Sequence, residues 1–344
     1  MEELDVRVLR SALAWQAQGE AVVLVTVART WGSSPRPPGS LMAVSAQGLT
    51  VGSVSGGCIE DDLVASIRAG GVSAVCAQGR PAVLRYGVSA EQARRFGLPC
   101  GGTVELVLEP VGPHSRLDEL LRARRERHSL RRVLHLPTGE VALQPGAHDA
   151  LPQLDDERLV TGFGPAPRLV LIGAGDLARF LAEMAGALGF EVIVCDPRPE
   201  QAVAWDLPGV AVHREMPDDL ILRLQPDART AVVALTHDPK LDDLALIDAL
   251  STPAFYVGAI GSRRHSAQRR QRLREHFGLD NAALERLRGP AGLYIGSKTP
   301  GEIALSILAE VVAAKNGVSL PAQARVAAAK ELATPAAVPA NTTP

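Results

Sequence analysis

The sequence predicts an α/β protein with two domains, an N-terminal α/β domain and a C-terminal domain built on a doubly wound parallel sheet. In the second half, short uninterrupted apolar runs alternate with glycine turns and amphipathic stretches, the pattern of buried parallel strands covered by helices. Hydrophobic residues make up 46% of the 344 residues but aromatic residues only 3%. The hydrophobic cores are therefore expected to consist mainly of small aliphatic side chains, as is usual for α/β layers.

The length of the chain favours two domains rather than one. We expect the N-terminal domain at residues 1–150, a linker at 151–167 and the parallel-sheet domain at 168–317. Residues 318–344 are rich in Ala, Pro and Thr, a composition that predicts a disordered tail.

Apolar periodicity and turn residues predict the elements of the N-terminal domain. The last helix of this domain, at 115–127, is rich in arginine. We interpret these arginines as a solvated face or, second, as a face for docking a partner. The predicted elements are a helix at 4–18, a strand at 21–27, an irregular Gly- and Pro-rich segment at 29–39, strands at 41–44 and 49–54, a helix after Cys58, strands at 81–86 and 104–108, a basic helix at 115–127, a hairpin at 130–136 and 141–143, and a loop from 146 to 167.

The same signals predict alternating strands and helices in the second domain. Its last helix begins with Thr299-Pro-Gly-Glu302, a capping box with proline in the first turn. The predicted strands are 169–172, 192–194, 210–213, 231–235, 254–257 and 293–295, and the helices follow Gly175, Lys240, Gly261 and Thr299.

A glycine turn opens this second domain. Gly173 and Gly175 follow the first strand at G-x-G spacing, and Asp196 ends the next strand, where an acid would bind a ribose. The arrangement predicts a Rossmann-like βαβ unit. A bound dinucleotide does not follow from it, because the fold is reused without one and the Asp176 carboxylate would repel a pyrophosphate unless it caps the helix.

Ligands in such sheets gather where the strands end in loops. That places His237, Gly258, Gly261 and Arg263 near a ligand bound at Gly173, with the glycine turn and the arginine suited to a phosphate. A catalytic pairing of His237 with the adjacent Asp238 is a weaker alternative, because neighbours in sequence need not face each other.

Two turns in the first domain combine a cysteine with two glycines, Gly56-Gly57-Cys58 and Cys100-Gly101-Gly102. A helix N-terminus at Cys58 would favour the thiolate, the nucleophilic and metal-binding form, and open amides there can hold an anion. With Arg36 nearby in a proline-rich loop, both cysteines are candidates for one site. The alternative is that they are small buried hydrophobic residues, which is our interpretation of Cys76 and Cys195.

Composition excludes several classes of function. The net charge of −2 predicts neither nucleic-acid nor membrane binding. The four cysteines form no C-x-x-C pair, so we expect no disulfide framework or structural zinc site, and a reducing cytoplasm. The N-terminus has no apolar signal core, and no stretch has the length of a membrane span.

The ordered motifs resemble those of the XdhC/CoxI family, the xanthine dehydrogenase accessory factors, over roughly residues 20 to 315. The chain departs from the family's pattern at Asp176, where His is usual, and at Arg264-His265, where Lys is usual. The motifs that carry the resemblance are Gly32-Ser-Ser-Pro-Arg-Pro-Pro-Gly39, Gly52-Ser-Val-Ser-Gly-Gly-Cys-Ile-Glu60, Cys100-Gly-Gly102, Gly173-Ala-Gly175, Asp196-Pro-Arg-Pro199, Thr236-His-Asp238, Gly258-Ala-Ile-Gly-Ser-Arg263 and Lys298-Thr-Pro-Gly-Glu-Ile303.

The resemblance implies a cytoplasmic, often dimeric chaperone without turnover. Such proteins bind molybdenum cofactor, as molybdopterin or its cytosine dinucleotide, assist its sulfuration with a cysteine desulfurase, and insert it into a molybdenum hydroxylase apo-enzyme of the xanthine dehydrogenase or CO dehydrogenase type. Carried over by motif, Arg36, Cys58 and Cys100 become cofactor ligands, both thiols with possible contact to molybdenum, and Gly56, Gly57, Gly101 and Gly102 become backbone donors.

Two other functions remain open at this point. An NAD(P)-dependent oxidoreductase would use the Rossmann-like domain and His237. A sulfurtransferase would carry a persulfide on Cys58.

Overall fold

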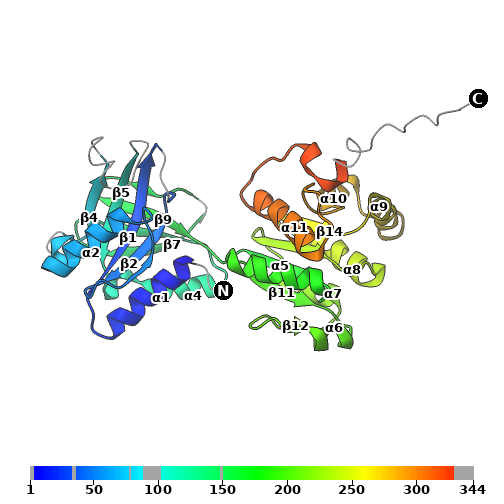
Figure 1. Ribbon diagram of the computed structural model, residues 1–344, viewed down its shortest axis with the longest axis horizontal. Helices are drawn as coiled ribbons and strands as arrows, with labels where there is room; N and C mark the ends of the chain where they lie inside the picture. Colours follow the sequence, from blue (N-terminus) through cyan, green and yellow to red (C-terminus); the bar gives the residue numbers. More distant parts are fainter. Residues whose placement is uncertain (1–3, 33–35, 77–78, 88–101, 148–149, 329–344) are drawn as a thin grey trace, which may run out of the picture. The chain divides into compact units, whose positions relative to one another are not determined.

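The structure, a computed structural model, describes residues 4–32, 36–76, 79–87, 102–147 and 150–328. The chain divides into two compact units, residues 2–166 and residues 167–344, which are described separately (Figure 1).

The N-terminal unit is built on a five-stranded antiparallel sheet. Its long central strand β1 (Val22–Trp31) is buried along most of its length, as its run of β-branched and aliphatic residues predicts. A bulge interrupts the pairing of β1 with β5 between Val27 and Arg29. In spatial order the strands are β3 (Thr50–Gly52), β2 (Leu41–Ser45), β1, β5 (Thr103–Pro110) and β4 (Ala82–Tyr86).

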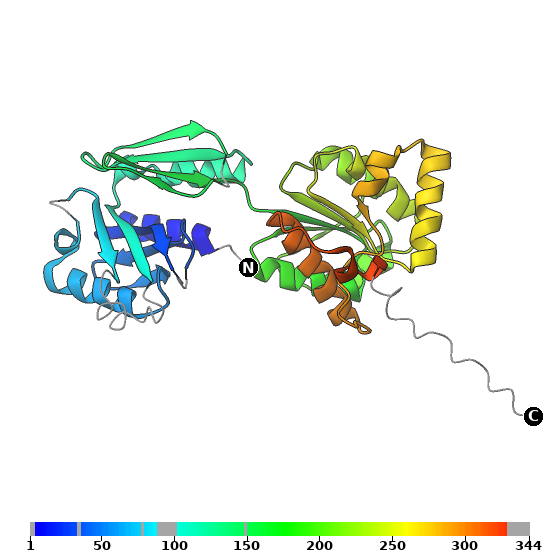
Figure 2. The ribbon, with the colours of Figure 1, turned by 90° about the horizontal axis from the view of Figure 1, so that it is seen from above.

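Helices cover both faces of this sheet (Figure 2). Helix α2 (Cys58–Gly70) packs on one face through Ile59, Leu63 and Ile67. On the opposite face lie α1 (Leu4–Ala17) and α4 (Leu117–Arg125). The alternation of side chains along the strands supplies a separate core to each face.

A four-stranded antiparallel sheet packs beside α1 and α4, in the order β7 (Val141–Pro145), β6 (Leu130–His135), β9 (Arg158–Phe163), β8 (Gln153–Leu154). The predicted hairpin is β6–β7. The prediction of a loop and linker at 151–167 was wrong for residues 153–163, because β9 pairs along the whole of β6. Short strands between turn residues give little local signal, and the pairing partner decides.

The C-terminal unit is a six-stranded, all-parallel sheet with spatial order β12–β11–β10–β13–β14–β15. In chain order this reads 3-2-1-4-5-6, the Rossmann arrangement, in which the direction of winding reverses between β10 and β13. The predicted Rossmann-like fold is therefore confirmed. The strands are β10 (Arg168–Ile172), β11 (Glu191–Cys195), β12 (Val212–His213), β13 (Thr230–Ala234), β14 (Tyr256–Ala259) and β15 (Leu287–Arg288).

Helices cover both faces of the parallel sheet, so its central strands are apolar on both sides (Figures 1 and 2). One face packs against α5 (Asp176–Ala187) and α11 (Pro300–Lys315). The other face packs against α7 (Pro217–Leu224), α8 (Pro239–Leu250), α9 (Arg263–Phe277) and α10 (Asn281–Arg286). Helix α6 (Pro199–Ala204) follows β11.

Two predictions at the end of this unit were wrong. The last strand is β15, and residues 293–295 contribute only an isolated bridge between Leu293 and Arg325. The prediction of a disordered tail from Val318 was wrong for residues 322–326, because a 3₁₀ turn at Ala322–Ala324 and its neighbours bond to residues 292–294. The backbone hydrogen bonds of residues 324–326 order this segment despite its Ala-rich composition. Residues 329–344 lie outside the described part of the chain.

A buried ion pair joins the two sheets of the N-terminal unit. Arg132 on β6 donates to Glu109 on β5 at 2.6 Å and to the Ser115 carbonyl at 3.0 Å. Their side chains are only 3% and 4% exposed.

We expect Arg132→Met to lower the unfolding free energy by about 3–5 kcal/mol, because it leaves the Glu109 carboxylate buried without its cation. Denaturant unfolding followed by circular dichroism measures the effect. Arg158→Met is the matched control, since its ion pair with Asp155 is 59% and 55% exposed and should cost less than about 1 kcal/mol. Equal losses in both variants would contradict the interpretation.

Candidate functional site

The glycine turn after β3 is wrapped around the Glu60 carboxylate. Glu60 is the third residue of α2, and from there its side chain reaches back over the turn that precedes the helix. It accepts backbone N–H groups from Val54, Ser55 and Gly56 on Oε1 at 2.8–2.9 Å and from Gly57 on Oε2 at 2.9 Å. The hydroxyls of Ser53 and Ser55 also donate to it.

These bonds stabilise the charged form of Glu60. Partial burial by itself raises the pKa of the carboxyl, but the hydrogen bonds from Ser55, Gly56 and Ser53 outweigh it and hold the pKa well below its ordinary 4.5. The amides of Gly56 and Gly57, predicted to hold an anion of the cofactor, are thus occupied by an anion of the chain itself. The turn is a backbone nest, as predicted, but its occupant is Glu60.

Cys58 and Arg36 flank this nest. Cys58 is the first residue of α2 and is exposed, whereas Cys76 and Cys195 are buried as predicted. Arg36 Nε donates to Ser53 Oγ at 3.2 Å, and Ser53 Oγ in turn donates to Glu60. Arg36 and Cys58 are therefore both attached to the same organised turn, at the N-terminus of α2.

The second predicted turn is described only at its last residue. Cys100 and Gly101 lie outside the described residues, and Gly102 is buried. A Cβ on Gly32 would lie 3.3 Å from the Gly102 Cα, so the two glycines let the chain after β1 pass close to the start of β5. Within the described ranges, no group of three or more His, Cys, Asp or Glu side chains could hold a metal ion.

In the C-terminal unit, Gly173 and Asp196 shape the turn at the switch point. Gly173 has φ of 111°, and a Cβ there would lie 3.0 Å from Thr236 Cγ2, so only glycine fits. The Asp196 carboxylate accepts the Ala174 amide at 2.9 Å and two Arg198 side-chain nitrogens at 2.8–2.9 Å.

Asp196 is completely buried. Burial opposes its ionisation, but the hydrogen bonds from Arg198 and Ala174 outweigh it and lower its pKa. In this arrangement the carboxylate fixes the G-x-G turn and presents no exposed oxygen to a ribose, unlike the predicted role. Its partner Arg198, two residues along the chain, carried no signal of this pairing in the sequence.

A pocket of about 290 Å³ lies at the carboxyl ends of β13 and β14. It brings together His237 and Gly261 of the predicted site, and the starts of α5, α9 and α11 contribute Leu177, Ser262 and Ile303. None of the described residues that line it is acidic. Partial positive charge at helix N-termini favours a ligand with an anionic or carbonyl group here. The other lining residues are Ile260, Pro290, Ala291, Ser297, Ser306 and Val326.

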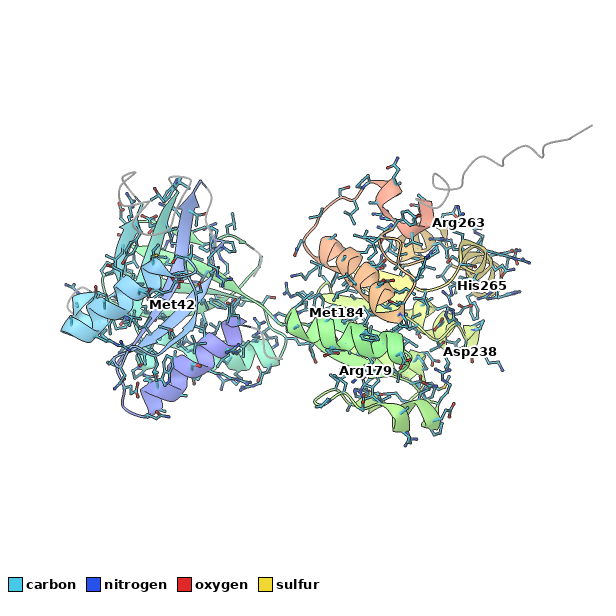
Figure 3. The ribbon with its side chains drawn as sticks, in the orientation of Figure 1. Met42, Arg179, Met184, Asp238, Arg263 and His265 are labelled. Atoms are coloured by element: carbon cyan, nitrogen blue, oxygen red, sulfur yellow. The ribbon has the colours of Figure 1, made fainter. Side chains whose placement is uncertain are left out.

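The remaining predicted residues of this unit do not line the pocket. Gly175 precedes α5 and is exposed. Gly258 is buried within β14, where a Cβ would overlap the Tyr256 ring. Arg263 is exposed at the first turn of α9, near which Figure 3 also labels His265, with Asp238 at the start of α8.

A buried network that was not predicted from the sequence holds the loops that form the pocket. Asp242 accepts the backbone amides of Thr236 and His237, both at 3.1 Å, and Arg269 donates to Asp242 at 2.8 Å and to the Ile260 carbonyl at 3.1 Å. His237 is held with φ of 65°, a left-handed conformation uncommon outside glycine. An acid in the first turn of α8 was the only available signal, and it also fits ordinary dipole stabilisation.

Comparisons with known proteins agree with this architecture. A model described as the XdhC and CoxI family matches residues 15–87, and one described as the XdhC Rossmann domain matches residues 169–311. The chain is 29% identical over 317 residues to the molybdenum cofactor insertion chaperone PaoD of Escherichia coli (strain K12), covering 90% of this chain and 88% of that protein.

A second relative, from Bacillus subtilis (strain 168), is named as a probable xanthine dehydrogenase subunit. It is 26% identical over 327 residues, covering 88% of this chain and 95% of that protein. The crystal structure of a xanthine dehydrogenase from Bacillus halodurans shares the fold with a TM-score of 0.72 and 24% identity, covering 93% of this chain and 97% of that chain. Within the described residues, no helix is both long enough and apolar enough to span a membrane.

We expect Glu60→Gln to lower the unfolding free energy at neutral pH by about 1–3 kcal/mol, because an amide replaces one acceptor oxygen with a donor that faces backbone N–H groups. The folded-state pKa of Glu60 is below 4.5. Its contribution is therefore complete above that value and is lost as the pH falls below it.

The wild type should consequently lose stability more steeply than Glu60→Gln as the pH falls below 4.5. Denaturant unfolding at a series of pH values measures both slopes. Asp61→Asn, the exposed neighbouring residue, is the control and should change the unfolding free energy by less than about 0.5 kcal/mol. Parallel slopes for wild type and Glu60→Gln would contradict the role of this carboxylate.

Proposed function

The chain belongs to the XdhC and CoxI family, and we propose that it is a chaperone that binds molybdenum cofactor and inserts it into an apo-enzyme of the xanthine dehydrogenase type. The observation that carries the proposal is similarity along 90% of the chain to a relative named for this function. The cofactor is cargo in this proposal, and the protein itself turns over no substrate.

The N-terminal turn supports the proposal chemically. Cys58 is an exposed thiol at a helix N-terminus, and thiolates bind soft metal centres and their terminal sulfur. Arg36, which donates to Ser53 of the same turn, is a guanidinium of the kind that binds phosphate. Because Glu60 occupies the amides of Gly56 and Gly57, we assign the phosphate to arginine rather than to those amides.

Several finer features belong to the same proposal. We propose that the chain assists sulfuration of the cofactor, with a cysteine desulfurase supplying the sulfur, and that it works as a cytoplasmic homodimer. The cofactor form is molybdopterin or its cytosine dinucleotide, and Cys100 joins Cys58 at the metal. CO dehydrogenase type apo-enzymes are a second class of client.

The oxidoreductase alternative draws less support from the geometry. A dinucleotide in a Rossmann unit places a ribose on the acid that ends the second strand. That acid, Asp196, is buried and bonded to Arg198. The sulfurtransferase alternative shares the exposed Cys58 with the main proposal, and mass spectrometry for one added sulfur on that thiol separates the two.

We expect wild-type protein from a host that makes molybdenum cofactor to carry pterin, measured by fluorescence after oxidation, and Cys58→Ser to retain about a tenth or less. Cys76→Ala is the matched control, because that thiol is buried in the core, and it should retain wild-type pterin. Absence of pterin from all three proteins, with NAD(H) bound instead, would overturn the chaperone proposal.

A further inference from the structure

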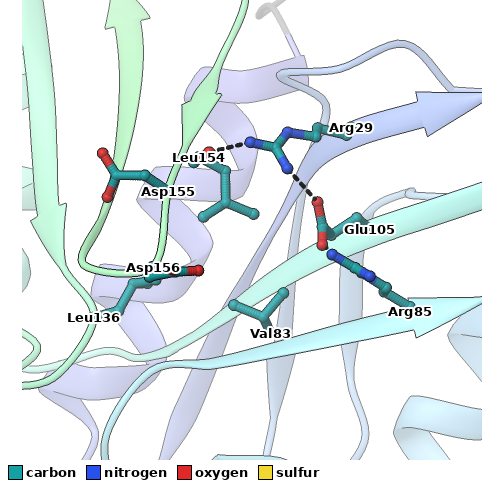
Figure 4. A pocket seen from close by; sticks show the side chains of 8 residues that line it. All are labelled: Arg29, Val83, Arg85, Glu105, Leu136, Leu154, Asp155 and Asp156. Carbon is teal, nitrogen blue, oxygen red and sulfur yellow. Dashed lines mark hydrogen bonds and ion pairs between the residues drawn. The ribbon is translucent and has the colours of Figure 1, made fainter.

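We propose that the N-terminal unit has a second binding site, for a phosphorylated heterocycle that carries an amino group beside a ring N–H. The site is a pocket of about 720 Å³ between the two sheets of this unit (Figure 4). It lies on the face of the five-stranded sheet opposite to α2, and so opposite to Cys58. It rests on its own geometry and not on the proposed function.

Two arginines meet over one buried carboxylate on the five-stranded wall. Glu105 on β5 is 1% exposed. It accepts Arg29 Nη1 at 3.3 Å and Arg85 Nε at 2.6 Å. One arginine neutralises Glu105, so the second leaves a surplus positive charge on this wall.

Glu105 also orients Arg85 for a ligand. Arg85 uses only its Nε in this contact, and its two Nη nitrogens bond to no residue that the structure describes. Arg29 is fixed on its other side by the Leu154 carbonyl. A guanidinium held by Nε presents its two Nη groups as a fork, the geometry that matches a phosphate.

The opposite wall offers an acceptor. Asp155 is satisfied within its turn by the amides of Glu157 and Arg158 and by the Arg158 side chain. Asp156 makes no hydrogen bond to a described residue, and in Figure 4 its carboxylate points toward the wall that carries Val83 and Arg85. A carboxylate accepts two parallel N–H donors, such as an amino group and the adjacent ring N–H.

Apolar side chains lie between these polar ends. Val83 on one wall and Leu136 and Leu154 on the other supply surfaces for a planar ring. The volume is that of a nucleotide-sized ligand site. The ligand class is therefore defined by an anionic group at one end of the molecule, a planar ring in the middle and N–H donors at the other end. A purine nucleotide of the guanine type belongs to it.

The test titrates guanosine 5′-monophosphate into the full chain by calorimetry, with inosine 5′-monophosphate and guanosine as comparisons. We expect guanosine monophosphate to bind more tightly than guanosine, which has no phosphate, and than inosine monophosphate, which has no amino group. Arg85→Gln should weaken binding about tenfold or more and abolish the advantage of the phosphate.

Asp156→Asn, an exposed position that does not touch the fold's ion pairs, should abolish the advantage of the amino group. Arg68→Gln, an exposed position on α2 at the opposite face of the sheet, is the control and should bind as wild type. Unchanged selectivity in both pocket variants, or no binding of guanosine monophosphate up to about 1 mM, would overturn the proposal.

This titration uses chain from a host that cannot make pterin, so its outcome does not depend on the chaperone proposal. Pterin retention in Cys58→Ser separately reports on that proposal.

Discussion

Carboxylates that bind the chain's own amides hold the turns of this protein in place. Glu60 takes four successive amides of the turn before α2, and Asp196 takes the amide of Ala174 within the G-x-G turn. Asp242 does the same for Thr236 and His237, and Glu310 for Gly292. A charged acceptor satisfies groups that would otherwise be unpaired next to a core, and it fixes the backbone geometry at the same time.

This arrangement changes how the two candidate sites are understood. Glycine turns at helix N-termini are ordinarily places where a ligand anion binds. Here the anion is internal at Gly56 and Gly57, and the acid expected to meet a ribose instead bonds to Ala174 and Arg198. The surfaces left for ligands are therefore side chains attached to these turns, Arg36 and Cys58 in one unit and the lining of the His237 pocket in the other.

Membership of the XdhC and CoxI family accounts for the pairing of the two folds in one chain, since the family's models match both units. The proposed division of labour follows from the chemistry of each unit. The N-terminal unit offers an exposed thiol and arginines, which suit a metal-bearing, phosphorylated cargo. The C-terminal unit offers a compact pocket at helix N-termini, with no acidic residue among the described residues that line it.

Local sequence patterns determined the order of strands and helices, because burial on both faces, glycine turns and capping residues act over a few neighbouring residues. They were sufficient for β10 to β14, for α5, α8, α9 and α11, for the start of α2 at Cys58 and for the burial of Cys76 and Cys195, but not for α6, α7, α10 or β15. They also placed Gly56, Gly57, Gly173 and His237 at turns.

Tertiary structure alone decided what those turns bind and which distant residues meet. Residues 153–163 become strands only because β6 is there to pair with them, and Ala324 and Val326 are ordered by bonds to residues 292–294. Arg29, Arg85 and Glu105 come from three strands whose neighbour relation is set by sheet topology. A hydrogen bond or ion pair between residues far apart in sequence leaves no periodic trace, since each partner's local pattern is the same whether or not the other is present.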